Sequence, residues 1–298
     1  MAILLILAFV LSIPLPTHLH DNASAVSQEF HKKCIEIIPH STQHASSLAA
    51  LVCGEKITDE KLKANLSKTS LIHIFVISGS HLILLDQLLG ILKIPLYLRF
   101  VFLGAYALFG GWQAPAVRAL LGFAVRETFA YRKIFFPADL IVLITGFTAL
   151  FLFQSYWQSL SFLMSWSAAL ALSVVAVFRV RNSFSKAVLS QFAIYFFMLA
   201  PLWGIGSLHP LSILYNLCLA PVVSFVLLPL SFFTVAMPPL AVVFDSVMNI
   251  FGSLLPLVAE PVKTAAVTAP TLPFLWLWLL GLHLCLHFLR LKLWQGKM

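Results

Sequence analysis

Long apolar runs separated by short polar gaps cover most of this chain. After an apolar opening at residues 1–16 and a polar stretch at 21–70, the runs cover residues 71–92, 95–111, 115–129, 137–153, 160–180, 187–206, 211–236, 240–258 and 272–291. A bilayer core takes about 20 apolar residues per helix, and backbone polar groups in lipid must be satisfied within the segment. The pattern therefore predicts an all-α integral membrane protein with about ten transmembrane or re-entrant helices.

The beginning of the chain divides into two parts. Residues 1–20 are expected to form a first transmembrane helix or a signal peptide. A small-residue cleavage pattern follows at Ala23-Ser24-Ala25, but no basic residue precedes the apolar stretch. Either alternative places residues 21–70 outside, as a short extracytoplasmic segment. Residues 71–298 then form one polytopic membrane domain.

Composition narrows the class of protein. Hydrophobic residues make up 60% of the chain and charged residues only 10%, whereas about a quarter of a soluble domain is charged. This excludes a large soluble catalytic domain. The formal net charge is +8, but most of the basic residues lie between apolar runs, where the positive-inside bias places them. The charge alone therefore does not indicate nucleic-acid binding.

Three basic clusters predict the orientation. An even number of predicted helices separates each cluster from the next, so all three lie on one face, which the positive-inside rule makes cytoplasmic together with the C-terminus. The clusters are Arg126, Arg132 and Lys133; Arg179, Arg181 and Lys186; and Arg290, Lys292 and Lys297.

The four cysteines fall into two kinds. Cys34 and Cys53 share the long polar segment and can form a disulfide if that segment faces an oxidising compartment. Cys218 and Cys285 lie in apolar runs and are interpreted as small core residues. No cysteine or histidine spacing matches a metal site, so we expect no metal and no other cofactor.

A few polar side chains interrupt the apolar runs. The first group is His73, Ser78, Gly79, Ser80 and His81, most of which share one face of a helix. Such a strip lines either a water-filled path or a close helix–helix interface that small residues allow.

Arg118 is the second polar interruption, within an otherwise apolar run. Burying its charge in a bilayer costs roughly 2.5–3.5 kcal/mol on insertion scales. The side chain therefore needs a carboxylate, backbone carbonyls or a polar path, and Asp86 and Asp245 are candidate ion-pair partners. The planar guanidinium also suits phosphate, so a structural ion pair and a pore-lining role both stay open.

Several short elements resemble one known family. His73-Ile74-Phe75-Val76-Ile77-Ser78-Gly79-Ser80-His81 looks like the His-Leu-x-x-x-Ser-Gly-Leu-His signature of the ComEC competence-protein family, with Ser80 in place of Leu. Pro115-Ala116-Val117-Arg118-Ala119 is similar to its Pro-x-x-x-Arg-Ala element. Three more elements follow the family order: Ala50-Leu51-Val52-Cys53-Gly54-Glu55, Leu160-Ser161-Phe162, and Asn216 with Pro221.

The resemblance implies a function that composition does not. It implies a bacterial inner-membrane channel that imports single-stranded DNA during natural transformation, with Asn216 added to the path-lining candidates. Separate DNA-delivery, nuclease or motor proteins are then expected as partners. No nuclease or ATPase signature is present, so we expect no enzymatic activity. The alternatives are a transporter or structural subunit for another cargo, and an intramembrane hydrolase with Ser78 or Ser80 as nucleophile.

Overall fold

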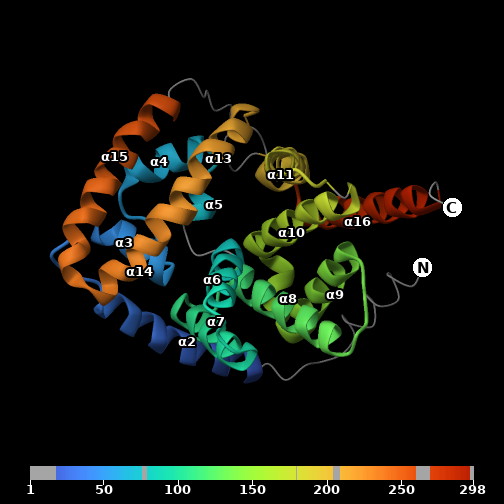
Figure 1. The fold of residues 1–298 in the computed structure, drawn as a ribbon, viewed down its shortest axis with the longest axis horizontal. Coiled ribbons are helices and arrows are strands. Elements are labelled where there is room, and N and C mark those ends of the chain that lie inside the picture. Colours follow the sequence, from blue (N-terminus) through green and yellow to red (C-terminus); the bar gives the residue numbers. More distant parts are fainter. Residues whose placement is uncertain (1–17, 76–78, 179, 204–208, 260–268, 296–298) are drawn as a thin grey trace.

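The computed structural model describes residues 18–75, 79–178, 180–203, 209–259 and 269–295. These residues form helices and connecting turns without any strand (Figure 1). The helices are α2 (His18–Glu36), α3 (Ala45–Cys53), α4 (Glu60–Lys68), α5 (Ile72–Phe75), α6 (Gly79–Ile91), α7 (Leu96–Phe109), α8 (Ala114–Tyr131), α9 (Ala138–Leu152), η1 (Gln154–Gln158), α10 (Leu160–Phe178), α11 (Ser183–Phe197), α12 (Leu199–Leu202), α13 (Leu211–Val222), η2 (Val223–Leu227), α14 (Leu228–Ala236), η3 (Pro238–Leu240), α15 (Ala241–Ala259) and α16 (Leu272–Gln295). The predicted all-α class is therefore confirmed.

The predicted number of about ten spans is not confirmed. Four stretches of the described residues are long and apolar enough to cross a membrane: Leu160–Phe178, Leu211–Ala236, Pro238–Ala259 and Leu272–Leu293. Other described apolar helices are shorter, among them α7 and α9. The predicted run at 187–206 is divided, because α11 ends at Phe197 and α12 follows at Leu199–Leu202.

Local sequence explains several helix ends. Gly54 adopts the left-handed conformation (φ 74°) that ends α3. The Asp59 side chain accepts hydrogen bonds from the first backbone N–H groups of α4, and Asn182 does the same for α11. Pro221 lies within α13, and the π-helical turn η2 follows it directly.

Buried apolar side chains form two main cores and a smaller one between them. The first core joins α3, α4, α15 and the π-helical turn, on the left of Figure 1. The second joins α9, α10, α11 and α16, on the right. The third is shared by α6, α7 and α8, which lie between the two. Because Leu48, Leu51 and Leu66 are fully buried in the first core, the predicted extracytoplasmic segment packs tightly onto the helical domain.

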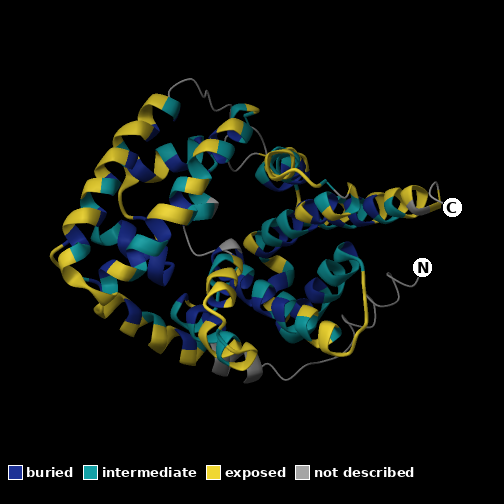
Figure 2. Ribbon diagram, viewed as in Figure 1, coloured by how far each residue is buried: buried dark blue, intermediate teal, exposed yellow. Residues whose placement is uncertain are grey.

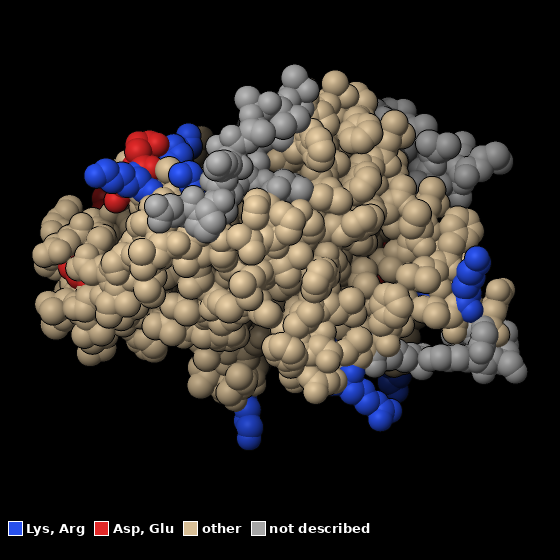
Figure 3. Space-filling view, turned by 90° about the horizontal axis from the view of Figure 1, so that it is seen from above, with Lys and Arg blue, Asp and Glu red and all other residues tan. Residues whose placement is uncertain are grey.

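Unlike the surface of a soluble protein, much of this surface consists of exposed apolar side chains. Figure 2 shows exposed residues along the outer sides of the helices, and on α15 these include Val242, Ile250 and Leu257, each more than 60% exposed. Figure 3 shows a face that is almost uncharged, with charged residues at its margins. Such a broad apolar surface needs lipid or a partner to cover it, as expected of a membrane protein.

Candidate functional site

In the candidate site, helices α6 and α8 approach each other closely at Gly79. A Cβ atom added to Gly79 would lie 3.2 Å from the carbonyl oxygen of Pro115 and 3.3 Å from Cβ of Ala119. These distances are shorter than ordinary van der Waals contact, so a glycine allows the two helices to meet here. Within the polar strip predicted around His73, Gly79 is thus the residue with a clear packing role.

Arg118 lies at this contact and is buried, with 7% of its surface exposed. Its Nε donates a hydrogen bond to Oγ of Ser165 in α10 (2.9 Å). Its Nη2 lies 3.5 Å from the position that a Cβ of Gly79 would occupy. The guanidinium therefore lies among α6, α8 and α10.

Asp86 and Asp245 were expected as ion-pair partners of Arg118, but the structure places other groups beside both carboxylates. Among the described residues no carboxylate lies within 4.0 Å of its guanidinium. Asp86 instead pairs with Arg99 and with Arg126 (Nη2 to Oδ2, 3.1 Å). The reason is geometric: Asp86 is seven residues beyond Gly79 on α6, about 10 Å along the helix axis.

Asp245 is also engaged elsewhere. Its carboxylate accepts hydrogen bonds from the Thr42 hydroxyl and from the backbone N–H groups of Gln43 and His44. These groups directly precede α3, where backbone donors lack partners within the helix. Asp245 in α15 therefore anchors the start of α3 and does not serve Arg118.

The Asp86 cluster combines two arginines with an aromatic ring. The guanidinium carbons of Arg99 and Arg126 lie 5.4 and 5.5 Å from the ring centroid of Phe123. Arg126 also pairs with Glu127 (3.0 Å), and half of the Arg126 side chain is exposed. This gives α8 a second arginine site, eight residues and about 12 Å beyond Arg118.

The other predicted path residues have different surroundings. His81 is 1% exposed, and its Nε2 lies 2.8 Å from the carbonyl oxygen of Ile74. Since a carbonyl only accepts, Nε2 carries the proton, and the ring connects α6 to α5. Ser78 and the side chains of His73 and Ser80 fall outside the described part of the chain.

Asn216 is buried in α13. Its Nδ2 donates to the carbonyl oxygen of Ser212 (2.9 Å), and its buried Oδ1 has no hydrogen-bond partner among the described atoms. No hydrogen bond of the described residues joins Asn216 to Arg118. The described contacts therefore give no direct link between these two candidates.

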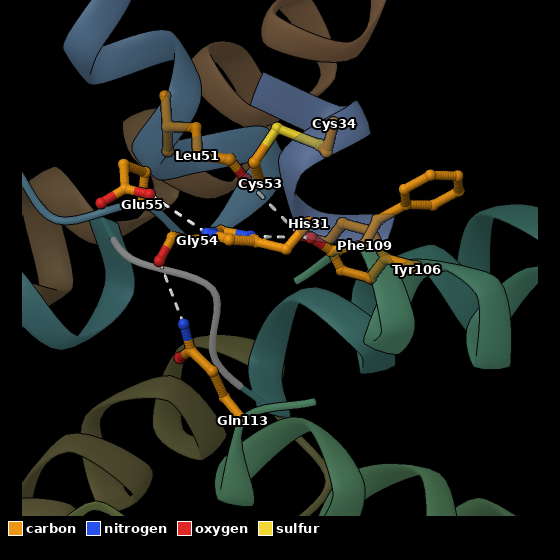
Figure 4. The surroundings of a disulfide bond; sticks show 9 residues. All are labelled: His31, Cys34, Leu51, Cys53, Gly54, Glu55, Tyr106, Phe109 and Gln113. Carbon is orange, nitrogen blue, oxygen red and sulfur yellow. Dashed lines mark hydrogen bonds and ion pairs between the residues drawn. A yellow bond between two sulfur atoms is a disulfide. The ribbon is translucent and has the colours of Figure 1, made fainter. Parts of the chain in front are cut away.

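A cleft of about 430 Å³ lies beside the start of α8. Figure 4 shows four of the residues that line it, His31, Gly54, Glu55 and Gln113. His31 of α2 contacts both of its walls: Nε2 lies 3.1 Å from a carboxylate oxygen of Glu55, and Nδ1 lies 3.1 Å from the carbonyl oxygen of Phe109. Gln113, the residue before α8, donates from Nε2 to the carbonyl oxygen of Gly54 (3.0 Å). These contacts join the α3–α4 connection to the turn between α7 and α8.

A disulfide lies behind this cleft. Cys34 and Cys53 are bonded, and their Cα atoms are 5.8 Å apart. Cys34 follows His31 by about one turn of α2, and Cys53 directly precedes Gly54 and Glu55. The bond therefore holds the two elements that supply the His31–Glu55 pair.

Sequence reasoning missed several of these residues. Ser165 stands close after the Leu-Ser-Phe element, and Gln113 lies in the Gly- and Pro-interrupted segment before Arg118. These neighbouring elements could have marked Ser165 and Gln113 as candidate site residues. Glu55 ends one of the elements that resemble the family, but Arg99, Phe123 and His31 carried no signal, because their roles arise from contacts between distant helices.

Comparison with known proteins gives one match. Residues 51–296 match the family described as "Competence protein". No curated protein and no solved structure matches the chain. The matched range includes Gly79, Arg118 and Ser165, whereas α2 precedes it.

Proposed function

Because this chain belongs to the competence protein family, we propose that it forms the channel through which one DNA strand enters the cell during natural transformation. The membrane is the bacterial inner membrane, and the strand leaves toward the side of the basic clusters. Separate proteins would deliver the DNA, degrade the second strand and drive movement. The chain itself acts without enzymatic activity or a cofactor.

The observation that carries the proposal is the buried guanidinium of Arg118. A structural arginine in an apolar interior is usually paired with a carboxylate, because an unpaired buried charge is strongly unfavourable. Here the nearest described partner is the neutral hydroxyl of Ser165. The start of α6 also lies against this guanidinium, and helix N-termini favour anions. This combination suits the phosphates of a passing strand.

The polar positions along α8 suggest the direction of the path. Gln113 borders the cleft, Arg118 follows within the helix, and Arg126 lies at the far end with Arg99 and Asp86. From Gln113 to Arg126 the helix rises about 20 Å. Three polar sites therefore lie along one helix in an apolar environment. A flexible polyanion can bridge the distances between them.

The structure corresponds to a closed conformation in this proposal. Arg118 and His81 are both more than 90% buried, so a strand reaches Arg118 only after neighbouring helices separate. The close approach at Gly79 is the contact that such a movement would break. Opening would expose the guanidinium between α6, α8 and α10.

The proposal is tested by transformation of a deletion strain that carries variants of this chain. We expect Arg118→Ala to lower uptake of labelled DNA and transformation frequency about tenfold to hundredfold, the loss of one charge-assisted contact of 1.5–3 kcal/mol. Arg118→Lys keeps the charge and should retain part of the activity. Arg132→Ala removes an exposed charge just after α8 and serves as the matched control.

Two results would overturn the channel function. One is normal transformation by the deletion strain itself. The other is wild-type transformation by Arg118→Ala at equal amounts of protein in the membrane. A fluorophosphonate label on Ser78 or Ser80 would instead support the hydrolase alternative.

A further inference from the structure

The cleft beside Gln113 has the size of a ligand site. Its volume of about 430 Å³ lies within the range of roughly 300–1,000 Å³ that is usual for small-molecule sites. It lies between the α3–α4 connection and the turn before α8. Gln113 borders it, and Arg118 follows one and a half turns later on α8.

The lining of the cleft separates apolar from charged groups. Ile57 and Ile72 give it apolar surface, and Gly54, Gly110 and Gly111 bring backbone close to the space without side chains. Lys56 and Lys63 line it as exposed cations, and the Lys63 ammonium also forms a solvent-exposed ion pair with Glu60 (3.1 Å). A planar base suits the apolar part, while a phosphate suits the two ammonium groups.

The single carboxylate in the lining is already engaged. One oxygen of Glu55 contacts His31 (3.1 Å), and the other accepts the backbone N–H of Lys56 (3.0 Å). The carboxylate therefore opposes an incoming phosphate less than a free one would. Gln28 and Gln113 add neutral amide groups that can bond to a base or sugar.

We infer that this cleft binds one nucleotide of a single DNA strand and is the first station before Arg118. The base lies against Ile57 and Ile72, and the adjoining phosphates contact Lys56 and Lys63. The inference rests on the proposed channel function and adds to it a binding site partly built by α2, outside the matched family range.

The disulfide gives the inference a second, independent consequence. Cys34 and Cys53 hold α2 to the end of α3, so they position His31 beside Glu55. Breaking the bond loosens the wall of the cleft without removing any lining group. Strand binding should therefore weaken on reduction, and Cys34→Ser with Cys53→Ser should reproduce this effect under oxidising conditions.

The test is binding of a fluorescein-labelled oligothymidylate of twelve nucleotides to the full chain in lipid nanodiscs. We expect Lys56→Gln with Lys63→Gln to weaken binding at least about tenfold. The slope of log affinity against log salt should become shallower by about 1.4, as two phosphate contacts on a single strand predict. Lys32→Gln with Lys33→Gln removes the same charge from α2 outside the cleft, and should leave both quantities unchanged.

A second variant fills the cleft without changing its charge. Gln28→Trp adds bulk at an exposed position that lines the cleft, and it should weaken binding while the salt slope is retained. Equal loss in the two lysine pairs, or unchanged binding in both cleft variants, would overturn the nucleotide site.

These outcomes are separable from the channel function. If the cleft variants bind normally but uptake still requires Arg118, the channel function stands and the cleft site is wrong. If the cleft variants lose binding but import DNA normally, the cleft is not a station on the path.

Discussion

Arg290, near the end of α16, forms an ion pair with Asp139 at the first turn of α9 (Nε to Oδ1, 3.2 Å). The N–H does not point at the oxygen, so the contact is an ion pair without a well-formed hydrogen bond. The pair places the end of α16 beside the start of α9. The α8–α9 connection, with Arg132 and Lys133, thus lies at the same end of the helices as the C-terminal basic cluster. This contact is consistent with the prediction that these two basic clusters lie on one face. It does not depend on the number of helices between them.

Removing either partner should destabilise the protein. Asp139 is 2% exposed, and breaking a buried pair typically costs about 3–5 kcal/mol because one charge stays buried without compensation. We expect Arg290→Gln to lower the free energy of unfolding by about 3 kcal/mol, measured by titration with denaturing detergent.

The double variant Arg290→Gln with Asp139→Asn provides the control. It leaves no unpaired charge, so its stability should exceed that of Arg290→Gln alone. If the two single effects simply add, the residues do not interact in the folded protein.

Gly146 supports a second prediction, about packing in the second core. A Cβ at this position would overlap the ring of Trp166, which is fully buried and donates a hydrogen bond to His283 (2.8 Å). Gly146→Ala must therefore displace the indole. We expect a loss of about 1–3 kcal/mol in stability, as overpacking produces, seen as a lower thermal midpoint in detergent.

Gly104→Ala is the matched control for this substitution. Gly104 is also within a helix, but apart from its chain neighbours and its own helix backbone, no described atom lies within 4 Å of a Cβ added there. Alanine should be neutral or slightly stabilising at that position, because it favours helix more than glycine does. A Gly146→Ala protein as stable as the Gly104→Ala protein would contradict the packing of Trp166.

The pattern of apolar residues predicted the fold class, whereas the contacts between distant helices were not predictable. Helix class was predictable because apolar runs in lipid leave few alternatives to helix. Arg118 was recognisable as a candidate because its charged side chain lies within an otherwise apolar run. The partners of Asp86 and Asp245 were not predictable, because a single sequence does not encode which distant helix lies opposite each carboxylate.

The disulfide leads to a third prediction, on thiol reactivity. Unfolded protein that has not been reduced should bind two maleimide groups, at Cys218 and Cys285, whereas reduced protein should bind four. Bridging residues 19 apart should contribute about 3 kcal/mol to stability in the chain-entropy description. Four labels without reduction would show that the bond is absent and would remove the bracing of the cleft.

The fourth prediction concerns the α6–α8 contact. Two effects of an alanine at Gly79, higher helix propensity and overpacking, act in opposite directions on stability. Gly79→Ala improves helix propensity by at most about 1 kcal/mol, but its methyl group would lie 3.2 Å from the Pro115 carbonyl oxygen. A backbone carbonyl cannot rotate away as a side chain does, and overpacking costs about 1–3 kcal/mol. The unfavourable effect should prevail, so we expect lower stability together with reduced DNA uptake, since the guanidinium of Arg118 borders the same contact.

Gly122→Ala is the control, because Gly122 also lies in α8 but faces α9 and not α6. A Cβ at Gly122 would lie 3.7 Å from Cγ2 of Thr145, an ordinary contact, so alanine should fit there with normal uptake. Thermal midpoints in detergent and transformation frequencies would be measured for both variants at matched membrane levels. If Gly79→Ala were as stable and as active as Gly122→Ala, the close approach of α6 to α8 would be wrong. The placement of Arg118 at the N-terminal end of α6 would then lose its support.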